Sequence, residues 1–152
     1  LRFDSKNIAA ARTDETLVIR LLSGRFPDYR AVMENIHGTP VVSDRESLGK
    51  CLERTHVMAQ DHGNHVSLYL TGKDYMEMKS SNPDLGDAED QIPVQTKLQE
   101  ITAGFNANYL IQCLKVMKSR EVNILLKDGR SPALLTGEAD EGFSYVIMPL
   151  AV

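Results

Sequence analysis

The chain has 152 residues, with 17 lysines and arginines against 21 aspartates and glutamates, and its formal net charge is -4. This negative net charge excludes a protein that binds nucleic acid over its whole surface, so any contact with DNA must be local. The composition, 42% apolar and 25% charged, is that of a globular protein, and no apolar run of about 18 residues is present to span a bilayer.

The first 25 residues predict a β-hairpin. Two strand-like runs, Asn7–Arg12 and Glu15–Leu22, flank a turn-prone Thr13-Asp14 pair. We expect this hairpin to belong to a larger sheet, and the absence of Met or an apolar leader at Leu1 predicts a chain cut from a longer protein. Pro27 and the polar residues after it interrupt the pattern, which predicts a linker over residues 26–38 and a new domain over residues 39–152.

Two amphipathic helices are predicted in the second domain. Ser43 and Glu46 have the spacing of a capping box, with Ser43 as N-cap, and Asn106 is the expected N-cap of the second helix. The apolar residues that follow recur at spacings of three and four: Leu48, Cys51, Leu52, Thr55, Met58 and Ala59 in the first helix, which runs to Gln60, and Tyr109, Leu110, Cys113, Leu114 and Met117 in the second. Both cysteines therefore read as buried free thiols, which suits a reducing cytoplasm.

The remaining pattern predicts strands joined as hairpins. Ser80–Asp84 breaks the alternation, and Pro93 favours an edge or a bulge. The predicted strands are Val41–Val42, His65–Leu70, Tyr75–Lys79, Ala88–Thr96, Leu98–Thr102, Glu121–Lys127, Pro132–Leu135 and Phe143–Met148. Eight strands with only two helices predict an α+β domain in which an antiparallel sheet carries both helices on one face.

A metal-dependent hydrolase is one functional hypothesis. Asp61, His62 and His65 have the spacing of metal ligands, but they lie at a predicted helix-to-strand turn without an obvious further ligand. No nucleophile elbow or phosphate-binding glycine loop accompanies them. We therefore predict no catalytic residues, no metal and no cofactor, and a generic protein-binding scaffold stays as a further alternative.

Four segments resemble one known family in the right order and at the right distances: Gly24–Arg30, Gly104–Leu110, Ser131–Leu135 and Tyr145–Leu150. The resemblance is to the bacterial DNA polymerase III beta subunit, the sliding clamp, with residues 1–25 similar to the end of domain two and residues 39–152 to domain three. It implies a DNA-clamp fold and a non-catalytic processivity factor. Such a factor forms a homodimeric ring around double-stranded DNA when full length, without reading the DNA sequence.

The resemblance also implies a cleft that binds short peptide motifs. Its partners would be the DNA polymerase III catalytic subunit, the clamp loader, other polymerases and repair proteins. The matching positions are Pro27, Val32, Asn106, Tyr109, Arg130, Pro132, Val146, Met148, Pro149 and Leu150. From the residues alone, Val146–Leu150 is also compatible with a buried last strand, and Asn106 and Tyr109 with an N-cap and a core aromatic. Ala31 and Ala151 replace arginines that are frequent in the family, which affects peptide specificity.

Two further surfaces follow from the resemblance. Basic residues on the two helices would face DNA, namely Lys50, Arg54, Lys115, Lys118 and Arg120, although a solvated helix face balanced by Glu46 and Glu53 is an equal alternative. The ring interface would use Val57, Met58, Asp84, Asp87, Glu89 and Asp90, for which the alternatives are a helix core and an acidic, edge-protecting cluster.

Overall fold

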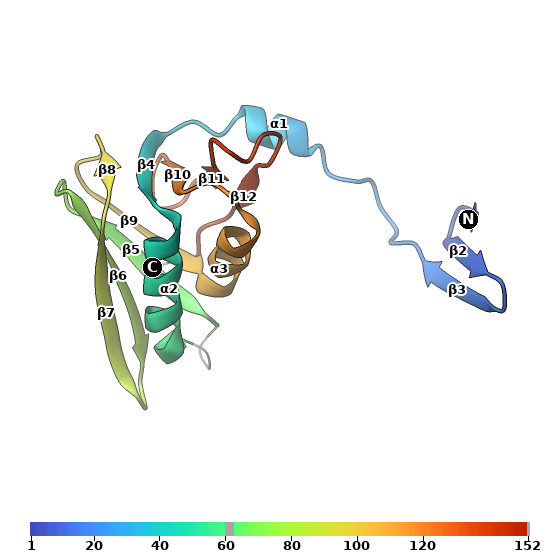
Figure 1. The fold of residues 1–152 in the computed structure, drawn as a ribbon, viewed down its shortest axis with the longest axis horizontal. Coiled ribbons are helices and arrows are strands. Elements are labelled where there is room, and N and C mark those ends of the chain that lie inside the picture. The colour runs from blue at the N-terminus through green and yellow to red at the C-terminus, as the bar shows by residue number, and fades with distance from the viewer. Residues whose placement is uncertain (60–62, 152) are drawn as a thin grey trace.

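The N-terminal part of the chain is a small antiparallel sheet. The structure, a computed structural model, describes residues 1–59 and 63–151 (Figure 1). Strands β1 (Arg2–Phe3), β2 (Asn7–Arg12) and β3 (Glu15–Arg20) pair in the order β1-β2-β3, which confirms the predicted hairpin and adds the two-residue β1. Leu17, Val18 and Ile19 are 49–62% exposed, so this sheet carries apolar surface that nothing in the described chain covers.

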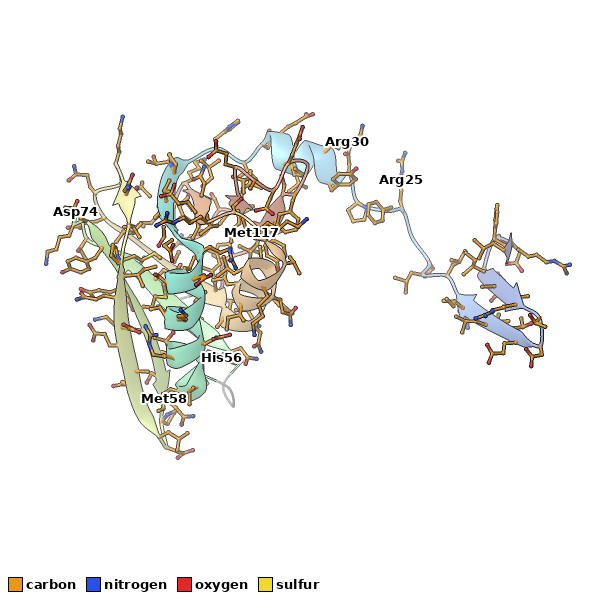
Figure 2. All side chains as sticks on the ribbon, in the orientation of Figure 1. Arg25, Arg30, His56, Met58, Asp74 and Met117 are labelled. Carbon is orange, nitrogen blue, oxygen red and sulfur yellow. The ribbon has the colours of Figure 1, made fainter. Side chains whose placement is uncertain are left out.

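A connecting segment joins this sheet to the rest of the chain. Within the predicted linker the structure contains a short helix, α1 (Tyr29–Glu34), that the sequence pattern did not indicate. The Asp28 carboxylate accepts the Ala31 N–H at 3.2 Å and starts the helix, but no residue of α1 is buried. Figure 2 shows the Arg25 and Arg30 side chains on this segment, apart from the large sheets.

The main body contains two antiparallel sheets and two helices, which confirms the α+β prediction. The strands form two sheets, however, and not the single sheet that was predicted. The five-stranded sheet has the order β12-β11-β10-β4-β8 and the four-stranded sheet the order β7-β6-β5-β9. The elements are β4 (Thr39–Asp44), α2 (Arg45–Ala59), β5 (His65–Leu70), β6 (Tyr75–Asn82), β7 (Gly86–Pro93), β8 (Gln95–Thr96), β9 (Ile101–Asn106), α3 (Ala107–Val116), β10 (Glu121–Leu126), β11 (Ala133–Thr136) and β12 (Tyr145–Ile147).

The order of strands shows an internal duplication with exchanged strands. The units β4-α2-β5-β6-β7 and β9-α3-β10-β11-β12 have the same succession of elements. The first strand of each unit pairs with the second strand of the other, β4 with β10 and β9 with β5. The first residue of each helix makes the matching bond: Arg45 N–H donates to the Arg120 carbonyl and Ala107 N–H to the Asn64 carbonyl, both at 2.8 Å. Each unit therefore supplies the strand that completes the sheet of the other.

One hydrophobic core lies between the sheets and the helices. Helix α2 packs against α3 and against β5, β6 and β7, as Figure 1 also shows. Phe105, on β9, is 1% exposed and is among the largest fully buried side chains. Both cysteines are free and buried, as predicted, and burial raises the pKa of Cys51 to about 12 and that of Cys113 to about 11. These thiols are therefore unreactive at neutral pH.

The predicted capping of α2 is wrong by one residue. The helix starts at Arg45, and the Asp44 carboxylate accepts the Ser47 N–H at 2.8 Å, whereas the Ser43 hydroxyl donates to the Pro93 carbonyl at 3.1 Å. Ser43 cannot cap because it is a buried residue of β4. The Arg45 guanidinium in turn donates to the carbonyls of Leu114 and Ser119 at the end of α3.

The apolar stripe of α2 also differs at its end. Met58 is only half-buried, whereas Ala59 is buried as predicted and His56 is buried as well, with its Nε2 2.6 Å from the Asn64 side-chain oxygen. This hydrogen bond makes burial of the imidazole tolerable. Figure 2 labels both side chains toward the end of α2 that lies away from α1.

Three predicted strand limits are also corrected. Strand β6 continues through Ser80 to Asn82 because both polar side chains find partners: Ser80 Oγ donates to the Thr55 carbonyl, and Asn82 Oδ1 accepts two N–H groups of the next turn. The strand predicted over 88–96 is divided at Val94, since β7 pairs with β6 while β8 pairs with β4 in the other sheet. The next strand, predicted over 98–102, is β9 at Ile101–Asn106. No helix among the described residues is long and apolar enough to cross a membrane.

Candidate functional site

Three segments that are distant in sequence border an open hollow at one edge of the four-stranded sheet. They are strand β9, the turn between β10 and β11, and the residues that follow β12. The hollow measures about 780 Å³ and is lined by Thr102, Asp128, Gly129, Arg130, Ser131, Pro149, Leu150 and Ala151. We name it the terminal hollow, because the last described residues of the chain form one wall.

The turn that forms the second wall is held by one carboxylate. Asp128 Oδ1 accepts the N–H groups of Arg130 at 2.8 Å and Ser131 at 2.6 Å, and Oδ2 accepts the Ser131 hydroxyl at 2.9 Å. These hydrogen bonds, that of the Arg130 N–H first, hold the pKa of Asp128 below its ordinary value. A side chain at Gly129 would place its Cβ 2.0 Å from the Thr102 carbonyl oxygen, so only glycine allows the turn to lie this close to β9.

The third wall is the C-terminal segment, which leaves one sheet and joins the other. After β12 the Leu150 N–H donates to the Gly104 carbonyl of β9 at 2.8 Å. Because this bridge is antiparallel, the residues just before Leu150 lie on the side of Asn106, at the end of β9. Met148 is 60% exposed and Leu150 39% exposed, so the residues after β12 present apolar side chains to solvent, whereas Ile147 on β12 is buried.

Helix α3 begins beside this segment. Asn106 Oδ1 accepts the N–H groups of Asn108 at 3.0 Å and Tyr109 at 3.4 Å, so Asn106 caps the helix. Tyr109 is 54% exposed and is therefore not a core aromatic. Burial, together with the neighbouring Cys113 and Tyr109, raises the pKa of Tyr145 on β12, which places the start of α3 close to that strand.

The structure brings together only part of the cleft inferred from resemblance. Arg130, Pro149 and Leu150 line the terminal hollow; Pro132, half-buried, follows its turn, and Val146, also half-buried, pairs with Leu134 on β11. Pro27 and Val32 lie outside the hollow, exposed on the connecting segment and α1. Sequence reasoning missed Asp128 and Gly129. An Asp-Gly pair between two strands is a recognisable side-chain-stabilised turn and could have indicated both.

The low pKa of Asp128 gives an expected pH dependence. A carboxyl whose pKa is lower in the folded than in the unfolded state contributes stability above its unfolded value of 3.8, and this contribution is lost as the pH falls through the folded pKa. Asp128→Asn keeps an oxygen that can accept the turn N–H groups but carries no charge. We expect its stability to fall less between pH 5 and pH 2 than that of the original chain, as measured by urea unfolding at each pH in that interval. An equally steep decline in both proteins would contradict this assignment.

The basic residues considered for DNA are largely paired with acids. Lys50 lies 3.8 Å from Glu46, Lys115 lies 3.1 Å from Glu53, and Arg54 Nε donates to Asp90 at 2.7 Å. Within the described chain no ion pair is found for Lys118 or Arg120, which follow α3. The helix surface therefore carries balanced charge along α2, with unpaired positive charge beyond the end of α3.

The residues considered for a ring interface lie at one end of the four-stranded sheet. Val57, on α2, is 52% exposed and Met58 is half-buried. Asp87, Glu89 and Asp90 lie on β7, the edge strand, and Asp84 lies in the turn before it. Glu89 pairs with Lys79 at 3.1 Å, and Asp90 pairs with Arg54. This edge is free to pair with another chain, and its charge is acidic.

The residues of the metal hypothesis are only partly visible. Asp61 and His62 lie outside the described residues, while His65 lies at the start of β5, with its Nε2 buried and without a hydrogen-bond partner in the described part of the chain. Across residues 1–59 and 63–151 no three His, Cys, Asp or Glu side chains gather closely enough to hold a metal ion.

Comparison with solved structures shows that the fold is that of a sliding clamp. The chain superposes on DNA polymerase III beta subunit of Thermotoga maritima with a TM-score of 0.80 at 26% identity, covering 99% of this chain and 41% of that one. It superposes on the sliding clamp of Bartonella birtlesii bound to griselimycin with a TM-score of 0.82 at 26% identity, covering 98% of this chain and 40% of that one.

The sequence defines the family. Residues 32–151 match the family described as DNA polymerase III beta subunit, C-terminal domain, and the chain belongs to this family. The beta sliding clamp of Pseudomonas putida is 31% identical over 144 residues, which is 95% of this chain and 39% of that relative. The chain thus spans about two fifths of the length of such relatives.

Proposed function

We propose that this chain is the C-terminal part of a sliding clamp, a non-catalytic processivity factor that tethers the replicative polymerase to DNA in the bacterial cytoplasm. Residues 1–25 would be the end of domain two, residues 26–38 the connection, and residues 39–152 domain three. The observation that carries the proposal is that the matched family segment, residues 32–151, contains a hollow with exposed apolar side chains at its rim.

The terminal hollow and its surroundings suit a short peptide of a partner protein. Met148, Leu150 and Tyr109 expose apolar surface to water. Covering this surface with a partner's apolar side chains lowers the free energy, because the apolar area is removed from water. Strand β9 is an edge strand, bridged by Leu150, so backbone groups are close to the apolar surface. Two apolar anchors would contribute about 2–5 kcal/mol before ordering costs, which favours micromolar binding and exchangeable partners such as polymerases, the clamp loader and repair proteins.

The helices and the acidic edge support the remaining functions of a clamp. Lys118 and Arg120 supply positive charge beyond the end of α3, while the paired lysines and arginine on α2 and α3 keep that attraction weak. Weak contacts to phosphates hold double-stranded DNA without reading bases and so permit sliding. Strand β7, with Asp87 and Glu89, would close a homodimeric ring against a basic surface of a second protomer.

Peptide binding tests the proposal. A labelled peptide with a glutamine and a Leu-x-Phe anchor is expected to bind saturably, with the Met148→Ala and Tyr109→Ala variants each about tenfold weaker because each loses roughly one apolar contact of 1–2 kcal/mol. Fluorescence anisotropy measures the dissociation constants. Val116→Ala is the matched control, since Val116 is 64% exposed at the other end of α3. Binding that is absent, or that all three variants weaken alike, would refute the proposed site.

A further inference from the structure

Among the residues that the structure describes, Arg130 is the one positively charged residue that lines the terminal hollow. Its backbone N–H is held by Asp128 at 2.8 Å, which fixes the position of the residue on the turn. Its side chain is exposed, and within the described residues no carboxylate lies within ion-pair distance of its guanidinium. The backbone of Arg130 is thus held in place while its guanidinium is exposed and unpaired. The guanidinium is therefore available to a ligand.

Asp128, the acid that lines the same hollow, does not compete for the guanidinium of Arg130. Both carboxylate oxygens of Asp128 are engaged by the turn itself, through two backbone N–H groups and the Ser131 hydroxyl. The other lining residues are uncharged: Thr102, Gly129, Ser131, Pro149, Leu150 and Ala151. An apolar side chain that covers Pro149 and Leu150 therefore brings its flanking residues within reach of Arg130.

We propose that Arg130 selects partner peptides that carry a carboxylate next to the apolar anchor. The inference rests on the proposed peptide-binding function and adds its specificity. A guanidinium donates two parallel N–H groups, a geometry that matches a carboxylate and that a neutral side chain does not reproduce. The carboxylate belongs either to an Asp or Glu side chain beside the anchor or to the C-terminus of the peptide.

The test compares matched peptides on the 152-residue chain. Each peptide carries the same Leu-x-Phe anchor, flanked by Ala, by Asp or by Lys, and each is made with a free and with an amidated C-terminus. Amide chemical shifts followed by NMR give dissociation constants up to the millimolar range. The proteins are the original chain, Arg130→Gln, Arg130→Glu and, as control, Arg12→Gln, which alters an exposed arginine of the small N-terminal sheet.

We expect Asp to strengthen binding about three- to fivefold over Ala, as for an exposed ion pair. This preference for Asp over Ala is expected to disappear in Arg130→Gln and to reverse in favour of Lys in Arg130→Glu. The control Arg12→Gln is expected to keep it, and high salt is expected to reduce it in the original chain. If only the free C-terminus shows the effect, the terminal carboxylate is the ligand. The inference is overturned, and the proposed function left standing, if Asp and Ala peptides bind with equal affinity and free and amidated C-termini also bind with equal affinity. Failure of every peptide to shift the hollow's resonances overturns both.

Discussion

Replacing Phe105 with alanine is expected to lower the free energy of unfolding by about 3–5 kcal/mol, the usual cost of removing a buried aromatic ring. Phe105 is 1% exposed on β9 and pairs with Val66 on β5. The cavity left behind lies where the two units of the duplication meet, and the surrounding strands cannot collapse into it without breaking their pairing.

The measurement is the midpoint of urea unfolding, followed by far-ultraviolet circular dichroism. Phe26→Ala is the matched control, because Phe26 is 81% exposed on the connecting segment and its removal should change stability by less than about 0.5 kcal/mol. A Phe105 variant as stable as the Phe26 variant would mean that β9 is not part of the core.

Gly129→Ala should destabilise the chain by about 1–3 kcal/mol, the range for forcing extra atoms into a closely packed site. The added Cβ would lie 2.0 Å from the Thr102 carbonyl oxygen, which is backbone and cannot swing aside. The turn must therefore move away from β9, and since this turn carries Arg130 and forms a wall of the terminal hollow, peptide binding should weaken together with stability.

Gly49→Ala distinguishes a local clash from a general effect of the substitution. Gly49 lies within α2, and a Cβ there would meet no atom within 4 Å. Alanine favours a helix over glycine by about 1 kcal/mol, so this variant should be more stable than the original chain and bind peptide normally. Thermal unfolding and peptide anisotropy on both variants check the two expectations, and a Gly129 variant that gains stability would contradict the close approach.

The local pattern was enough to predict most elements of the main body. Apolar spacing located α2 and α3, and Asn106 was correctly expected to cap α3 because its side chain follows a strand and precedes an apolar stripe. The predictions failed where a distant partner decides the outcome. Ser43 has the local chemistry of an N-cap, but its burial against Pro93 leaves that role to Asp44.

Strand limits were predicted less well for the same reason. Within residues 88–96 Pro93 indicates an edge or a bulge but not a change of sheet at Val94, since that exchange depends on pairing with β6 on one side and β4 on the other. The duplication is likewise not apparent in the sequence pattern, because it lies in the order and pairing of the elements.

The candidate site was less predictable than the fold. Arg130, Pro149 and Leu150 were singled out by resemblance, whereas the physics of their own segments favoured a buried strand for the last two. Met148 and Leu150 are exposed, and Leu150 is joined to Gly104 by a single bridge that no sequence pattern indicates. The arrangement of Asp128 against Gly129 and Thr102 depends on contact between two sheets, which local propensity does not describe.

The exchanged strands have a consequence for how this domain gains and loses its structure. Because β4 completes the sheet of the second unit and β9 that of the first, either unit alone would leave an open, apolar sheet edge. Folding must therefore bring together residues that are distant in sequence before either sheet is closed, and for the pairing of β4 with β10 these residues lie more than half the domain apart. Such non-local pairing slows folding. A domain built this way is expected to unfold as one cooperative unit and not strand by strand.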